Sequence, residues 1–196
     1  DVDCVNLERI CRDNDVVLFL STYYSRPLTT PALMMIYDMI PELLGFDLNA
    51  PMWREKHLAI KEAARFICIS KNTAADLTKY CAINSERIVV AHCGVDSNFV
   101  PATERENRAF QVRYGITRPY FLVVGERGSY KNAGLLFSAM HLLPNPGDYQ
   151  VVCLGGRPQM EPEYLPLITG LDVVMLRAAN EEMHCAYSGA IALAYP

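Results

Sequence analysis

The sequence predicts an α/β fold of two lobes, each built on a parallel β-sheet. Short runs rich in Val, Ile and Leu alternate with helix-like stretches of about ten residues, which is typical of βαβ units whose sheets are covered on both faces. A polar segment at 97–119 that contains two prolines interrupts this alternation and predicts a linker with a short helix. We therefore assign the two lobes to residues 1–98 and 99–196.

In the first lobe, apolar runs predict four strands, at 16–21, 32–38, 64–70 and 87–92. Between the second and third strands, residues 49–64 predict an amphipathic helix. Its apolar side carries Met52 and Ala59, and Lys56 interrupts that side. The helix between the last two strands is expected to begin at Asn72 or Thr73, because both residue types accept hydrogen bonds from a first helical turn.

In the second lobe the alternation is more regular. It predicts strands at 120–125, 149–156, 172–177 and 190–196. It also predicts helices at 133–143, at 161–170 and at 180–189, with Asn180 capping the last one. Ligands of open parallel α/β sheets bind at the carboxyl ends of the strands, so the loops that follow these strands are candidate sites.

Composition makes several classes of protein improbable. Hydrophobic residues make up 51% of the chain and charged residues 20%, which favours a packed core over disorder. The net charge of −4 disfavours a nucleic-acid partner. No apolar run approaches the ~18–20 residues of a membrane span, and the N-terminal residues lack a signal-peptide pattern. The seven cysteines show no C-x-x-C spacing, so we expect no metal site and a reducing, cytoplasmic location.

The loop GERGSYKN (125–132) places two cations, Arg127 and Lys131, between a strand and a helix N-terminus. It matches neither G-x-x-x-x-G-K-[ST] nor G-x-G-x-x-G. A helix N-terminus nevertheless favours anions, and Arg can grip a phosphate bidentately while Lys adds a point charge. The alternative is a solvated turn in which Arg127 pairs with Glu126 or with another surface carboxylate.

Taken in order, several segments resemble the retaining nucleotide-sugar glycosyltransferases of family four, which have the GT-B fold of two Rossmann-like lobes. The upstream segments STYYSRP and MMIYDMIPEL are similar to bacterial mannosyltransferase-like members. The resemblance covers nearly the whole chain and is carried by residues 21–27, 34–43, 70–96, 113–140, 149–156 and 173–196.

The resemblance implies transfer of a hexosyl group from a nucleoside-diphosphate sugar to a hydroxyl acceptor, with retention of configuration. The first lobe would be the later part of the acceptor side, and the second lobe the first part of the donor side. Asp38 and Tyr37 would face the sugar or the acceptor. In the donor lobe, Arg127, Lys131 and Gly125 would bind the diphosphate, and backbone near Gly155, Met175 and Leu176 would border the base and ribose.

The resemblance also implies that transfer needs neither cofactor nor metal. The donor would be GDP-mannose or a UDP-hexose, the acceptor a saccharide or a lipid-linked acceptor, and the pathway polysaccharide biosynthesis. Peripheral contact of the 54–65 helix with the inner face of the cell membrane is left open. A non-catalytic module that binds nucleotide sugars is the alternative function.

Three departures from the family pattern qualify these expectations. Glu126 occupies the place where members commonly have Arg, so Arg127 is displaced by one residue. Tyr37 stands where many members have His, and a phenol with a pKa near 10 cannot replace imidazole as a base. The spaced carboxylate pair of the family and its first glycine-rich loop are absent, so we expect a fragment truncated at both ends that is inactive by itself.

Overall fold

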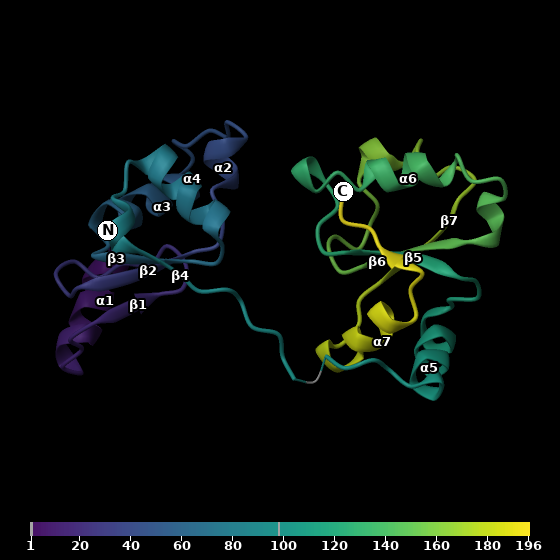
Figure 1. The fold of residues 1–196 in the computed structure, drawn as a ribbon, viewed down its shortest axis with the longest axis horizontal. Helices are drawn as coiled ribbons and strands as arrows, with labels where there is room; N and C mark the ends of the chain where they lie inside the picture. The colour runs from purple at the N-terminus through teal and green to yellow at the C-terminus, as the bar shows by residue number, and fades with distance from the viewer. Residues whose placement is uncertain (1, 98) are drawn as a thin grey trace. The chain divides into compact units, whose positions relative to one another are not determined.

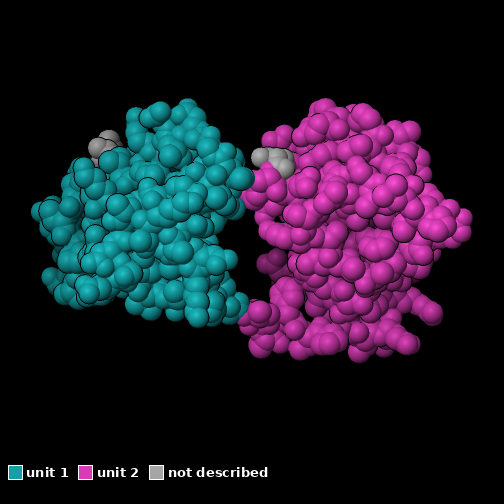
Figure 2. Space-filling model, turned by 45° about the horizontal axis from the view of Figure 1, so that its top comes forward, with its two compact units in different colours: residues 1–94 teal, residues 95–196 magenta. Residues whose placement is uncertain are grey.

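The computed structural model describes residues 2–97 and 99–196, which form two compact units (Figures 1 and 2). The first unit covers residues 1–94 and the second covers residues 95–196. The lobe boundary predicted between residues 98 and 99 involves residue 98, which lies outside the described residues.

The first unit is a parallel sheet with helices on both faces. Its strands are β1 (Phe19–Ser21), β2 (Ala32–Ile36), β3 (Arg65–Cys68) and β4 (Ile88–Val90), and they pair in sequence order, β1-β2-β3-β4. The helix α1 (Val2–Asp13) covers one face, as Figure 1 shows. The other face carries α2 (Ile40–Leu43), α3 (Pro51–Glu62) and α4 (Lys71–Cys81), and the 3-10 helix η1 (Ser85–Arg87) precedes β4.

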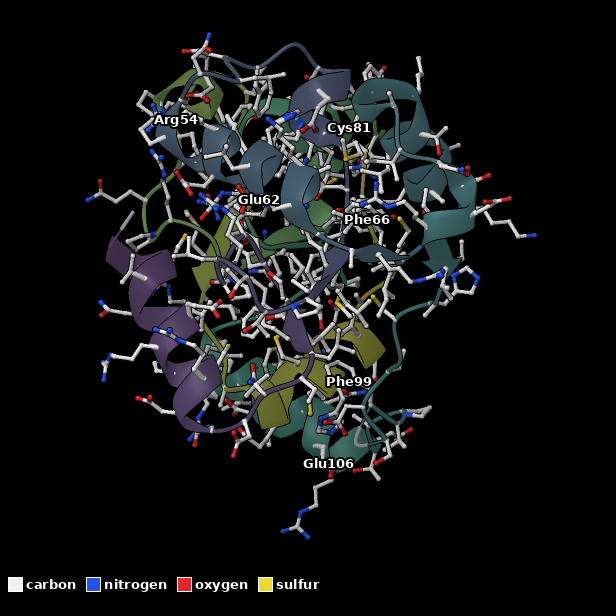
Figure 3. The ribbon with its side chains drawn as sticks, turned by 90° about the vertical axis from the view of Figure 1, so that its left-hand side faces the viewer. Arg54, Glu62, Phe66, Cys81, Phe99 and Glu106 are labelled. Carbon is white, nitrogen blue, oxygen red and sulfur yellow. The ribbon has the colours of Figure 1, made fainter. Side chains whose placement is uncertain are left out.

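The core of this unit lies between the sheet and the helices α3 and α4. Phe66 on β3 is fully buried and packs with Ala59 and Ile60 of α3 and with Leu77 of α4 (Figure 3). Cys68 is fully buried as well, and burial raises the pKa of its thiol to about 11, so it packs as a small protonated hydrophobe.

Several predictions for this unit were wrong in detail. The helix α1 was not predicted, and α4 begins after Ser70, whose Oγ accepts a hydrogen bond from the Thr73 amide at 3.0 Å. On α3 the buried side differs from the predicted apolar side: Met52, predicted to be buried, is 48% exposed, whereas the charged Lys56 is buried. The strand β2 ends at Ile36, so Tyr37 and Asp38 follow it.

The second unit has the same layers but a different strand order. Its parallel strands are β5 (Tyr120–Val124), β6 (Gln150–Leu154), β7 (Asp172–Leu176) and β8 (Ala192–Leu193), arranged β7-β6-β5-β8. The helices α5 (Glu104–Tyr114) and α7 (Met183–Ser188) lie on one face and α6 (Gly134–Met140) on the other, in Figure 1 below and above the sheet. Four 3-10 helices complete the unit: η2 (Ser129–Lys131), η3 (Pro146–Asp148), η4 (Pro162–Tyr164) and η5 (Asn180–Glu182).

Helix ends in this unit follow local hydrogen bonding. A capping box starts α5, because Thr103 Oγ1 accepts from the Glu106 amide while the Glu106 carboxylate accepts from the Thr103 amide. The predicted helix at 161–170 is only the 3-10 turn η4, since Pro166 lacks the amide hydrogen that a longer helix would need. Asn180 lies inside η5 and does not cap α7.

Both faces of this sheet are packed. Tyr120, Leu122 and Val152 face α5 and α7, whereas Val123 and Val151 face α6. The strand β6 is buried along its whole length, as expected for an inner strand of a covered parallel sheet. Among the described residues, no helix has the length and apolar character needed to cross a membrane. The predicted α/β class with two parallel sheets is confirmed.

Candidate functional site

The carboxyl edge of the second sheet is built from glycine turns. Gly125 follows β5, and Gly155 and Gly156 follow β6; their φ angles are +87°, +81° and +67°, a region that non-glycine residues rarely adopt. Parallel strands end at the same edge, so these turns meet. They border a pocket of about 350 Å³, lined by Val124, Gly125, Glu126, Leu154, Gly155, Gly156, Arg177, Ala178 and Met183.

Two of these turns touch through their backbones. A Cβ atom on Gly156 would lie 2.5 Å from the Gly125 carbonyl oxygen, which is closer than real Cβ contacts come. The sheet hydrogen bonds continue into the turns: the Gly125 amide donates to the Leu154 carbonyl at 2.8 Å, and the Gly155 amide donates to the Leu176 carbonyl at 2.9 Å. The pocket wall is therefore fixed backbone that a ligand can approach closely.

Arg127 lies inside the protein, with none of its surface exposed. Its Nε donates to Glu161 Oε2 at 2.9 Å. Its Nη1 donates to the Gly155 carbonyl at 3.0 Å, and its Nη2 donates to the carbonyls of Arg157 and Gln159 at 2.8 and 3.1 Å. The guanidinium is thus enclosed by the segment that follows β6.

This position bears on the diphosphate contact predicted for Arg127. A phosphate could reach the guanidinium only if the segment 155–161 opened and Glu161 lost its partner. The geometry resembles the alternative in which Arg127 pairs with a carboxylate, except that the carboxylate is Glu161 and the pair is buried. The sequence could not reveal this, because Glu161 lies far along the chain in a region with the pattern of a helix.

Lys131, the second cation of the loop, lies at the end of η2 and is partly exposed. Its Nζ donates to the Tyr195 hydroxyl at 2.8 Å and lies 5.4 and 5.1 Å from the ring centroids of Tyr130 and Tyr195. Tyr195 comes just after β8, the strand that pairs with β5 on the side away from β6. Lys131 therefore marks the point where the strand order reverses, which is where open α/β sheets bind ligands.

The residues predicted to border a base lie close to the pocket but differ in orientation. Leu176 packs toward α5 and α7, and Met175 packs on the opposite face, so neither side chain lines the pocket. The next residue does line it: Arg177 is exposed, and its Nη2 donates to the Gly156 carbonyl at 3.0 Å. Arg177 was missed, although a charged residue at the end of the predicted strand 172–177 was a usable signal.

In the first unit, Tyr37 and Asp38 form the turn between β2 and α2. Tyr37 is 40% exposed, and its carbonyl accepts from Thr73 Oγ1 at 3.3 Å. Asp38 Oδ1 accepts from the Ile40 amide at 3.0 Å, so part of this carboxylate is used in holding the turn. The structure places both residues after β2, at the carboxyl edge of their sheet.

A buried ionic network lies beneath this turn. Lys56 Nζ donates to Glu42 Oε2 at 2.8 Å and to the Asp38 carbonyl at 3.1 Å, and His57 Nε2 lies 2.9 Å from Glu42 Oε1. The side chains of Lys56 and Glu42 are each only 2% exposed. Because Lys56 interrupts an apolar helix side, its position in the sequence was a signal for this network. Among residues 2–97 and 99–196, no group of three or more His, Cys, Asp or Glu side chains is placed to hold a metal ion.

Comparison with known proteins identifies the class of fold to which the two units belong. A family model described as Glycosyltransferase Family 4 matches residues 14–99, which is less than half of the chain and lies mainly in the first unit. No curated protein is detectably similar in sequence. The fold of the two units, each with a parallel sheet, matches that of solved glycosyltransferases of the GT-B type.

Particular structures illustrate the likeness. WaaG, a glycosyltransferase involved in lipopolysaccharide biosynthesis, is 13% identical with a TM-score of 0.75 over 97% of this chain and 56% of its own. HepE from Anabaena, in complex with UDP-glucose, is 15% identical with a TM-score of 0.67 over 84% of this chain and 46% of its own. A UDP-GlcNAc 2-epimerase from Neisseria meningitidis, bound to UDP-GlcNAc, is 11% identical with a TM-score of 0.55 over 95% of this chain and 56% of its own. The chain thus spans about half the length of these proteins, and the likeness shows the fold.

Proposed function

We propose that this chain forms part of a glycosyltransferase that moves a hexosyl group from a nucleoside-diphosphate sugar to a hydroxyl acceptor, with retention of configuration. The observation that carries the proposal is the carboxyl edge of the second sheet. There, a reversal of strand order, a pocket walled by glycine turns and a partly exposed lysine occur together. The nucleotide would occupy the pocket, and the diphosphate would lie at Lys131.

The chemistry of transfer explains why a lysine belongs there. The bond from the sugar to the diphosphate breaks during transfer, and negative charge develops on the leaving phosphate oxygen. A cation held beside that oxygen stabilises the transition state more than the ground state. The hydrogen bond and ring contacts from Tyr195 hold Lys131 in place before substrate arrives.

The first unit would contribute Tyr37 and Asp38 to the transferred sugar or the acceptor. Tyr37 is 40% exposed and could offer its hydroxyl to a sugar hydroxyl, whereas the Asp38 turn is fixed by Ile40 and Lys56. Because HepE and the epimerase were crystallised with uridine nucleotides, a UDP-hexose is the first donor to test and GDP-mannose the second.

The test is nucleotide binding by calorimetry with UDP and GDP as probes, comparing the unmodified chain with Lys131→Met. The substitution should weaken binding of the preferred nucleotide by about 1–3 kcal/mol, the usual range for a lost charged hydrogen bond. NMR of the product of transfer, made by the protein of which this chain forms part with the matching sugar nucleotide, then gives the configuration at the anomeric carbon.

The matched control is Arg108→Met, which removes one positive charge from the exposed surface of α5, where Arg108 does not line the pocket. It should leave affinity unchanged. If the unmodified chain binds neither nucleotide, or if Lys131→Met and Arg108→Met bind equally well, the proposed function is wrong.

A further inference from the structure

The buried pair of Arg127 and Glu161 needs an explanation that packing does not supply. Removing two charges from water costs several kcal/mol per ion, and apolar residues of similar volume usually stabilise a core as well or better. Moreover, Glu161 Oε1 is buried without a hydrogen-bond partner among the described residues. Because burying this pair costs free energy, we look for a functional role of the pair at the neighbouring pocket.

The contacts of the guanidinium indicate that task. The Gly155 carbonyl points toward Arg127, from which it accepts a hydrogen bond. No peptide bond among the described residues is cis. In a trans peptide the N–H points opposite to the C=O, so the Gly156 amide is turned away from Arg127. Within the described part of the chain, this amide donates no hydrogen bond to protein. Gly156 lines the pocket, so its amide is a donor without a protein acceptor at the pocket wall.

We infer that Arg127 is a positioning residue of the donor pocket, whose charge orients the Gly155–Gly156 peptide so that the Gly156 amide donates to the nucleotide. The ligand group it meets is a hydrogen-bond acceptor, namely a carbonyl oxygen of a base or an oxygen of the ribose or phosphate. This inference rests on the proposed function, since it assumes that a nucleotide occupies the pocket.

Arginine suits this task better than lysine. The planar guanidinium has five N–H donors in a fixed fork, and four hydrogen bonds from Arg127 reach one carboxylate and three carbonyls of the segment 155–161. An ammonium group has three donors and no fixed plane. The Tyr164 hydroxyl, which donates to the Arg127 carbonyl at 3.0 Å, fixes the backbone of Arg127 to η4, which follows this segment.

The experiment must separate this role from a contribution to stability. A single substitution would leave one buried charge uncompensated and could unfold the unit. We therefore choose the double variant Arg127→Met/Glu161→Leu on the full chain, which removes both charges together. Thermal unfolding measures its stability, and calorimetry measures its affinity for UDP and GDP. We expect a folded variant whose affinity for the preferred nucleotide falls at least tenfold.

The control is the double variant Arg118→Met/Asp172→Asn, which removes an ion pair of 2.9 Å at the amino edge of the same sheet and should leave affinity unchanged. Hydrogen exchange provides a second readout: in the ligand-free Arg127→Met/Glu161→Leu variant, the amides of residues 155–157, 159 and 160 should exchange faster. A folded double variant that binds as tightly as the unmodified chain overturns the inference and leaves the proposed function standing. An unmodified chain that binds neither nucleotide overturns both.

Discussion

The two sheets carry ionic side chains at their carboxyl edges, but they use them differently. In the first unit the strands follow sequence order, and the charges of Glu42 and Lys56 are tied together under a turn. In the second unit the order reverses next to β5, and Lys131 reaches the surface at that reversal. A charged residue at a carboxyl edge can therefore be either buried in an ion pair, as Lys56 is, or partly exposed, as Lys131 is.

The same contrast occurs within a single loop. Arg127 and Lys131 are four residues apart, yet one is enclosed by the segment after β6 and the other lies beside Tyr195 after β8. Because the backbone turns between them, Arg127 lies on the β6 side of β5 and Lys131 lies on the β8 side. Substitutions in one unit at a time, each compared with a matched control, test this contrast.

The largest effect is expected from Lys56→Met. This change leaves Glu42 buried with only His57 as a partner and should destabilise the first unit by about 3–5 kcal/mol. Trp53, the single tryptophan of the chain, lies on the same helix α3 and packs against Tyr24 and Phe46. Denaturant unfolding followed by its fluorescence therefore reports on this unit.

Lys61→Met is the matched control, because Lys61 is exposed on the same helix. It should change the unfolding free energy by less than about 0.5 kcal/mol. Nucleotide binding by the second unit should be unaffected in both variants at denaturant-free conditions. Equal stability of the two variants would mean that the Glu42–Lys56 pair does not hold the Tyr37–Asp38 turn.

A smaller effect is expected from Gly156→Ala in the second unit. The new Cβ would meet the Gly125 carbonyl oxygen at 2.5 Å, and the φ of +67° strains an L-residue by roughly 1 kcal/mol. Gly115→Ala is a close control, because Gly115 has a φ of +68° but open space around it. Differential scanning calorimetry should give a larger loss of stability for Gly156→Ala, and the difference measures the contact between the two turns. Equal losses would contradict that contact.

The smallest effect is expected from Glu8→Gln and depends on pH. Glu8 accepts hydrogen bonds from Thr29 Oγ1 at 2.6 Å and from the amides of Thr29 and Thr30, and these bonds lower the pKa of its carboxyl to about 2. A lowered carboxyl pKa contributes stability that is present above the ordinary value of 4.5 and is lost as pH falls toward 2. The unmodified first unit should therefore lose stability across that window, and Glu8→Gln should flatten the loss.

Glu106→Gln serves as the comparison in the second unit. Its carboxylate is also hydrogen-bonded to Thr103, which lowers its pKa, but the residue is exposed at the start of α5. We expect a weaker flattening in this variant, because water can replace the lost bonds. Acid titrations monitored by circular dichroism would check both. A Glu8→Gln variant with the same acid profile as the unmodified chain would contradict the assignment.

The fold was largely readable from the sequence, because its strands are apolar runs and each predicted strand corresponds to an observed one. Predictions failed where a local signal competed with tertiary contacts. Pro166 prevents the helix expected at 161–170. Lys56 is buried in an apolar interface because its ammonium group pairs with Glu42. The loop sequence placed Lys131 between a strand and a helix N-terminus but could not reveal that Arg127 points inward, because its partner Glu161 is 34 residues away in sequence.

The outermost strands of the two sheets have a practical consequence for handling the protein. In the described sheets, β8 pairs only with β5, and Ile191, Leu193 and Tyr195 beside it are 50%, 47% and 69% exposed. On β1, at the end of the other sheet, Leu20 is 48% exposed. Open apolar strand edges recruit strands from other molecules. Purification at low concentration, with light scattering as a monitor, is therefore advisable before any affinity is interpreted.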